Sequence, residues 1–245
     1  MTVLAETFQP RLFLDGLEFV GENPGLIWDK TVEHLALSAA SIGVALLLAI
    51  PLGVWLGHLH RGSFLAINAG NVGRALPSLA VIAFGLAIFG IGFTNVMVAL
   101  VVLAVPPMLT NAYVAVDEVD PDAVEAARGM GMSALQMLLR VELPLALPLL
   151  FAGIRTASVY VVSTATIAAI AGGGGLGDII VNQASYRLRG VIGAALCVTV
   201  LALLVDLAFA TVQRLITPAG LRRAPPAFEP DTTTGRTPVA PPAAG

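Results

Sequence analysis

The sequence predicts an all-α membrane protein with about five transmembrane helices, its N-terminus outside the cell and its C-terminus in the cytoplasm. Hydrophobic residues make up 57% of the chain, charged residues 12%, and the mean hydropathy is +0.87. Soluble domains carry about 25% charged residues, so this chain has too few charges to cover a water-facing surface. Several apolar stretches long enough to cross a bilayer contain no Lys, Arg, Asp or Glu.

Residues 1–33 are predicted to be an external N-terminal segment. The segment has acidic residues but no basic region leading into an apolar core, so it does not resemble a cleavable signal peptide. An amphipathic helix on the outer surface is expected within it, with the apolar residues Leu12, Phe13, Leu17, Phe19 and Val20.

Residues 34–217 are predicted to form one membrane domain, in which the positions of the charged residues mark the spans. A bilayer-crossing helix needs about 20 apolar residues, and the first charge-free run places a span near 35–57. The next charge-free run, 75–116, is long enough for two spans. Its glycines and asparagine at 90–95 are typical of a turn, so we expect the chain to fold back there.

Two further spans are expected at about 144–171 and 191–212, and each contains one charged residue, Arg155 and Asp206. Charges within spans are costly and usually face protein or water. We expect these two to be close enough to pair across the helices. The pair would serve as a gate or a substrate contact, or alternatively as a structural ion pair; a snorkelling arginine is the third interpretation.

The distribution of basic residues predicts the orientation, because cytoplasmic segments carry the excess of Lys and Arg. With the N-terminus outside, the inner segments hold eight basic residues and the outer segments four: Arg61, Arg74, Arg128, Arg140, Arg214, Arg222, Arg223 and Arg236 against Arg11, Lys30, Arg187 and Arg189. Residues 218–245 are rich in proline and are expected to be a disordered cytoplasmic tail.

A polar segment at about 117–144, between the third and fourth spans, is predicted to form two short helices joined by a glycine turn. Asp120 is a favourable N-cap residue and is followed by proline. Gly129 and Gly131 are expected to end the first helix. The sequence from Ser133 to Gln136 fits a capping box that begins the second, which we expect to end at the membrane at Leu143-Pro144.

The same segment resembles the cytoplasmic EAA loop of ABC-importer permeases. The matching positions are Glu125, Ala126, Ala127, Gly131, Leu143 and Pro144, with the family's spacing. In that family the loop is the docking surface for a separate ATPase, and we take these six residues as the candidate docking site. The alternative is an ordinary surface loop between two spans.

Two other stretches resemble one branch of that family, the importers of the osmoprotectants glycine betaine, choline and carnitine. They are 74–80, Arg-Ala-Leu-Pro-Ser-Leu-Ala, and the glycine-rich 171–178, which methionine importers share. The family often has Gln at the position of Arg74. The resemblance covers about 31–217 and implies a MetI-like ABC permease fold. It also implies a multi-pass protein of the inner (cytoplasmic) membrane, surrounded by lipid, whose partners are ABC ATPase subunits, a second permease subunit and an extracytoplasmic substrate-binding protein.

Several other function classes are disfavoured. A Walker A lysine motif is absent from the sequence, so the chain is expected not to be an enzyme, and ATP hydrolysis would reside in the partner. The Gly-x-Gly-x-x-Gly pattern at 172–177 follows a predicted membrane helix rather than a strand, which argues against a dinucleotide cofactor. We expect no cofactor, metal or nucleic acid. The alternatives kept are a methionine or other amino-acid permease and, outside the class, a secondary transporter or a channel subunit.

A candidate translocation path lies on the fourth span, where Thr156, Tyr160 and Ser163 share one helix face. The alternative role for this face is hydrogen bonding between packed helices. The histidines His34 and His58, with His60, flank the first span and are expected to lie at the membrane interfaces.

Overall fold

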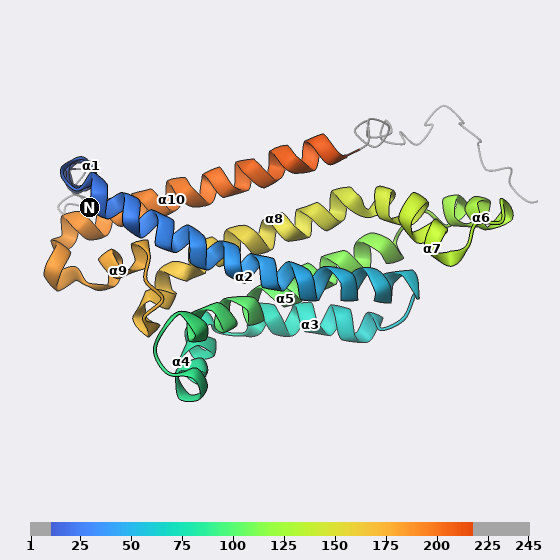
Figure 1. Cartoon of the computed structure of the whole chain (residues 1–245), viewed down its shortest axis with the longest axis horizontal. Coiled ribbons are helices and arrows are strands. Elements are labelled where there is room, and N and C mark those ends of the chain that lie inside the picture. The colour runs from blue at the N-terminus through green and yellow to red at the C-terminus, as the bar shows by residue number, and fades with distance from the viewer. Residues whose placement is uncertain (1–10, 218–245) are drawn as a thin grey trace, which may run out of the picture.

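The structure is a computed structural model that describes residues 11–217, and all regular elements within that range are helical. Four helices are long and apolar enough to cross a membrane, and a bent pair of helices would make a fifth span. Figure 1 shows the long helices running along one axis, with small helices at both ends. The elements are α1 (Arg11–Glu22), α2 (Pro24–His58), α3 (Ser63–Ala75), α4 (Ser78–Phe89), α5 (Phe93–Asp117), α6 (Pro121–Gly129), α7 (Ala134–Met137), the π-helix η1 (Leu138–Glu142), α8 (Leu143–Ala168), the 3₁₀ helix η2 (Ala169–Ala171), α9 (Leu176–Val181) and α10 (Gln183–Ile216).

Helix α5 forms the centre of the bundle and packs against α2, α3, α4 and α8. Its neighbours approach closely because they present glycines. A Cβ at Gly53 of α2 would lie 2.6 Å from the Cβ of Ala112, and one at Gly153 of α8 would lie 2.3 Å from the Cβ of Asn111. Small residues at helix crossings let backbones approach and gain van der Waals contact, which drives association in lipid.

The predicted first, third, fourth and fifth spans are confirmed as α2, α5, α8 and α10. The predicted fold-back within 90–95 is confirmed, with the turn limited to 90–92: α4 ends at Phe89 and α5 begins at Phe93. Between them Gly90 and Gly92 have φ values of +71° and +138°, which favour glycine.

The expected second span is wrong in its bounds. The helical chain begins at Ser63, not at residue 75, and bends by 96° between α3 and α4. Helix α4 has 12 residues, about 18 Å of helix, which is too short for a hydrocarbon core about 30 Å thick. Pro77 explains the break: it lacks an N–H, and it holds Leu76 in an extended conformation with ψ of 120°.

The second short helix of the polar segment does not end at Leu143-Pro144, as was expected. Instead one continuous helical run extends from Ala134 to Ala171. In a regular α-helix Pro144 would clash with the carbonyl of Arg140. The run has a π-helical turn at Leu138–Glu142, which widens the helix at this point and accommodates the proline.

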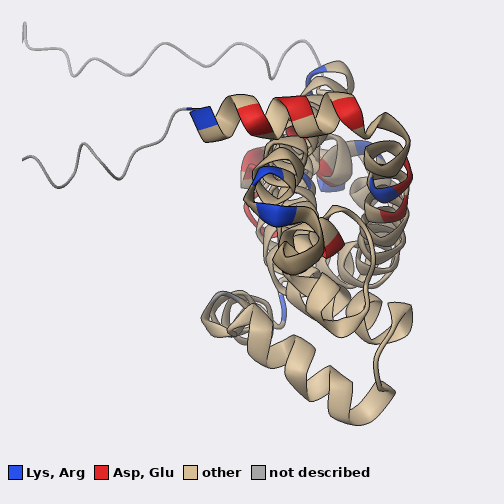
Figure 2. Ribbon diagram, turned by 90° about the vertical axis from the view of Figure 1, so that its left-hand side faces the viewer, with Lys and Arg blue, Asp and Glu red and all other residues tan. Residues whose placement is uncertain are grey.

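The two ends of the bundle carry different small elements. Figure 1 shows α6 and α7 at one end, with the C-terminal part of α2, and shows α1 and α9 at the other end. Figure 2 faces the end that carries α1, where several charged residues gather, while α4 has none. Helix α1, the expected amphipathic helix, packs on α10 with Phe19 buried. The expected boundary between residues 33 and 34 lies inside α2, and the tail 218–245 lies outside the described residues.

Candidate functional site

Within the candidate docking loop, 117–144, the two capped helices α6 and α7 form a compact knob. The side chain of Asp120 accepts a hydrogen bond of 3.0 Å from the N–H of Asp122 and so caps α6. Glu125 and Ala126 are exposed on α6, whereas Ala127 is buried, with 1% of its surface exposed. The outward part of the predicted motif is therefore Glu125-Ala126, and Ala127 packs within the chain.

Gly131 ends α6 in the left-handed region, with φ of +78°. The N–H of Gly131 donates to the carbonyl of Arg128, and the N–H of Met132 donates to that of Ala127. This pair of bonds is a Schellman motif, which satisfies the last carbonyls of a helix. The glycine is thus required by backbone geometry rather than by space, because a Cβ at this position would meet no atom within 4 Å.

The capping box at the start of α7 is present as the sequence predicts. The N–H of Ser133 donates to Oε1 of Gln136 at 2.9 Å, and the N–H of Gln136 donates to Oγ of Ser133 at 3.4 Å. Leu143 and Pro144 are half-buried in the first turn of α8. The knob is therefore joined to α8 without an intervening flexible segment.

Two histidines, one at the end of α2 and one two residues later, contact acidic residues on either side of this knob. Sequence reasoning missed this feature. Nδ1 of His58 lies 2.6 Å from Oε2 of Glu142, which follows the knob and has 3% of its side chain exposed. Nδ1 of His60 lies 2.8 Å from Oδ1 of Asp117, which precedes the knob. The expected interfacial role of these histidines was incomplete, because each one pairs with an acidic residue at the base of the loop.

Arg155 and Asp206 lie together, each on one of the last two spans. Nε and Nη2 of Arg155 donate to Oδ1 and Oδ2 of Asp206, both at 2.5 Å. About a third of each side chain is exposed, 37% and 35%. A cavity of about 690 Å³ opens beside the pair, so the two charges face open space rather than packed side chains.

Thr156, Tyr160 and Ser163 all lie on an exposed face of α8. The hydroxyl of Thr156 donates to the carbonyl of Ala152 in the preceding turn, at 2.9 Å. Tyr160 has 39% of its surface exposed. This face offers hydroxyl groups and one aromatic ring to whatever lies next to α8.

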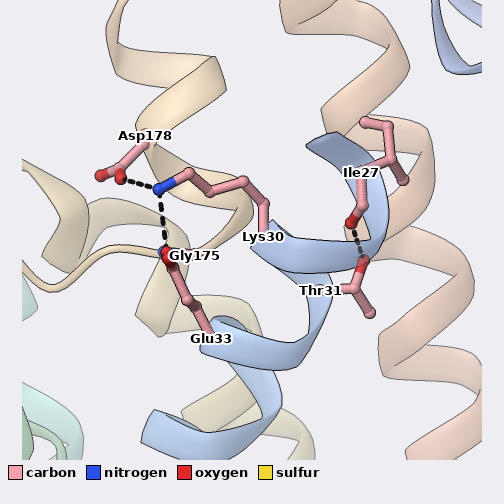
Figure 3. Close-up of polar contacts among 6 residues, drawn as sticks. All are labelled: Ile27, Lys30, Thr31, Glu33, Gly175 and Asp178. Atoms are coloured by element: carbon pink, nitrogen blue, oxygen red, sulfur yellow. Dashed lines mark hydrogen bonds and ion pairs between the residues drawn. The ribbon is translucent and has the colours of Figure 1, made fainter. Parts of the chain in front are cut away.

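The glycine-rich segment at the other end of the bundle is fastened to α2 by a charged network (Figure 3). Nζ of Lys30 lies 2.8 Å from carboxylate oxygens of both Glu33 and Asp178. Oε2 of Glu33 also accepts a hydrogen bond from the N–H of Gly175 at 3.0 Å. This network joins α2, α9 and the segment between η2 and α9.

Close packing explains the glycines of this segment. Gly175 has φ of +76°, and a Cβ there would lie 3.0 Å from Cα of His34. A Cβ at Gly177 would lie 2.3 Å from the carbonyl oxygen of Thr166. His34 is buried, and its Nε2 lies 2.9 Å from the carbonyl oxygen of Val162. This histidine is therefore packed between helices, and its position at a membrane interface stays a prediction.

Comparison with known proteins identifies a matching family and several similar permeases. The family described as binding-protein-dependent transport system inner membrane component matches residues 42–219. The choline transport system permease protein OpuBB of Bacillus subtilis is 38% identical over 84% of this chain and 96% of its own length. The glycine betaine/carnitine/choline transport system permease protein OpuCB of the same organism is 38% identical over 84% of this chain and 95% of its own length. The osmoprotectant import permease protein OsmW of Salmonella typhimurium is 34% identical over 85% of this chain and all of its own length.

Among solved structures, an inward-facing form of the MetNI methionine ABC transporter aligns with a TM-score of 0.66 and 25% identity. The alignment covers 76% of this chain and 94% of the solved chain. The expected MetI-like fold is confirmed by this similarity.

Proposed function

The chain belongs to the family of binding-protein-dependent transport system inner membrane components, and from this membership we propose that it is the permease subunit of an ATP-driven importer for quaternary ammonium osmoprotectants. Glycine betaine, choline and carnitine are the substrates named for its relatives. The proposed substrate class is supported by the 38% identity to two such permeases over nearly their whole length.

The knob formed by α6 and α7 is the proposed docking site for a partner ATPase. It stands at one end of the bundle (Figure 1), with Glu125 and Ala126 facing outward. Caps at Asp120, Ser133 and Gly131 make it rigid. The exposed surface of the knob has the acidic residues Asp120, Asp122 and Glu125 beside the large apolar side chains Met130 and Leu135. Such a surface suits a partner's groove that offers apolar walls and a basic side chain.

Movement of the knob would be transmitted to two membrane helices. The knob continues directly into α8, and Glu142 at its base is held by His58 of α2. A push on the knob by an ATPase would therefore displace α2 and α8 together, which fits a rigid-body switch between inward-facing and outward-facing states.

The remaining subunits of the proposed importer are a second permease subunit, of the same or a sister chain, and an extracytoplasmic substrate-binding protein. The exposed face of α8 with Thr156, Tyr160 and Ser163 would line the path between the two permeases. These groups bring mild polarity and no net charge. Tyr160 would add a cation–π contact of about 0.5–2 kcal/mol with a trimethylammonium group, weak enough for release.

Uptake of labelled glycine betaine, choline and methionine by the reconstituted complex tests this function. We expect ATP-dependent uptake of glycine betaine or choline, and little uptake of methionine. Methionine belongs in the test because a solved methionine importer shares the fold at 25% identity. Uptake of methionine alone would overturn the osmoprotectant assignment but not the family, and uptake without ATP would contradict the coupling to an ATPase.

A further inference from the structure

The ion pair between Arg155 and Asp206 is more open than an ion pair with a purely structural role requires. A charged group in a transmembrane helix is costly, and it is normally placed against protein or a water-filled space. Here the two side chains are about a third exposed and border a cavity of about 690 Å³. A second cavity of about 440 Å³ shares Arg155, Asp206 and Gln213 with the first and extends to Thr156.

The cavity is lined by polar side chains of α10 together with apolar ones, Leu207 and Ala210 of α10 and Pro148 of α8. Asp206, Gln213 and Thr217 line the cavity and are separated by seven and four positions, so they share one helix face. Val200 and Leu204 lie on a different face and are 55% and 57% exposed, as expected for contact with lipid. The pair therefore faces a space of mixed polar and apolar lining that reaches toward the end of α10, and the second cavity extends it to the candidate path at Thr156.

We propose that Arg155 and Asp206 together form a binding site for a zwitterion whose carboxylate and quaternary ammonium group lie on one short skeleton. This inference rests on the proposed function and adds the site and the charge type of its substrate. The substrate would lie antiparallel to the ion pair, with its carboxylate at Arg155 and its trimethylammonium group at Asp206.

The chemistry of the two side chains fits both ends of such a substrate. A guanidinium group has five N–H donors, and Asp206 is bound through Nε and Nη2. Nη1 and the second hydrogen of Nη2 then form the edge that binds carboxylates with two parallel bonds. A trimethylammonium group has no N–H, so it needs only the negative charge of Asp206. Because site and substrate are each neutral overall, binding brings no net charge into the membrane.

The geometry also predicts selectivity by charge type. Choline has a hydroxyl group where glycine betaine has a carboxylate, so it would use Asp206 alone and would be repelled by Arg155. A zwitterion gains from both side chains. Removal of the positive charge should therefore harm zwitterion transport and spare or favour transport of the cation.

The test is ATP-dependent uptake of glycine betaine, carnitine and choline by the complete complex with three variants: Arg155→Gln, Asp206→Asn and the two combined. We expect Arg155→Gln to lower uptake of glycine betaine and carnitine at least tenfold and to leave choline uptake unchanged or raised. Asp206→Asn should lower uptake of all three. The double variant, which has no unpaired charge, should assemble and retain ATPase activity while zwitterion uptake stays at least tenfold reduced. The control is Glu22→Gln with Arg189→Gln, a pair at 3.1 Å on α1 and α10, which should leave uptake unchanged.

A structural pair would behave differently. If the double variant restored uptake of all substrates, or if Arg155→Gln lowered choline and glycine betaine uptake equally, the site would be overturned. Wild-type uptake of choline alone would overturn the zwitterion site and leave the proposed function standing. Wild-type uptake of none of the three would overturn the proposed function and this site with it.

Discussion

Nδ1 of His58 lies 2.6 Å from a carboxylate oxygen of Glu142, and this contact joins the end of the first long helix to the base of the docking knob. Both side chains are largely buried, with 13% and 3% exposed. Glu142 belongs to the π-helical turn that precedes α8, and such turns occur often at functional positions. The pair therefore connects three parts of the proposed coupling path: α2, the knob and α8.

We expect His58→Ala to lower both stability and coupling. It leaves the buried Glu142 side chain without its hydrogen-bond partner, which costs about 1–3 kcal/mol. His60→Ala is the matched control, because His60 is 61% exposed and such a pair contributes about 0–1 kcal/mol. Thermal unfolding of the purified protein and substrate transported per ATP hydrolysed are the measurements. Equal effects of the two substitutions would contradict a special role for His58.

Gly131→Val should distort the knob and uncouple ATP hydrolysis from uptake. Gly131 has φ of +78°, and a left-handed conformation costs an ordinary residue roughly 1–2 kcal/mol, with a β-branched side chain at the upper end. Gly129→Ala is the control, since a Cβ at Gly129 meets nothing within 4 Å and its φ is helical. We expect membrane insertion to be normal in both variants. If Gly131→Val transported at the wild-type rate per ATP, the docking role of the loop would be wrong.

The features that could be predicted from the sequence are those governed by local chemistry or by the cost of charge in lipid. The caps at Asp120 and Ser133 depend on residues two and three positions away, so their patterns are visible in the chain. Arg155 and Asp206 could be paired because each is the single charge of its span. Four of the five spans could be predicted from runs with either no charge or a single one.

The missed features depend on tertiary packing. His58 and Glu142 are 84 positions apart, and each lies near the end of a span where charged residues are common, so no pattern joins them. The bend before Pro77 is not visible in the charge pattern, because the charge-free run begins only after Arg74. The structure carries α3 past Arg74 to Ala75, and the proline rather than the charge sets the break.

The orientation of the chain in the membrane is testable by labelling. Ser133 on the knob and Asn182 beside α9 are both exposed and belong to elements at opposite ends of the bundle (Figure 1). With Cys197→Ala as background, Ser133→Cys should react with a membrane-impermeant thiol reagent only from the cytoplasmic side. Asn182→Cys should react only from outside. Reversed labelling would place the knob beyond the reach of a cytoplasmic ATPase.

Tyr160→Ala should lower the rate of glycine betaine transport several-fold and leave assembly with the ATPase unchanged. Tyr160 is 39% exposed on α8, so its loss removes a surface contact rather than core packing. The π-face contributes about 0.5–2 kcal/mol to binding of a trimethylammonium group, which corresponds to a change of about two- to thirtyfold in affinity. Tyr160→Phe is the control, because it keeps the ring and removes only the hydroxyl group.

The two Tyr160 variants separate the two roles open to this side chain. A cation–π contact predicts near-normal transport for Tyr160→Phe, whereas a hydrogen bond to a neighbouring helix predicts that both variants fail equally. Competition with unlabelled substrate tests which chemical class the path accepts. Excess glycine betaine should inhibit uptake, and excess methionine, which lacks a fixed trimethylammonium charge, should not. Equal inhibition by both would mean that the face with Tyr160 does not select for a quaternary ammonium group and would favour a broader amino-acid specificity.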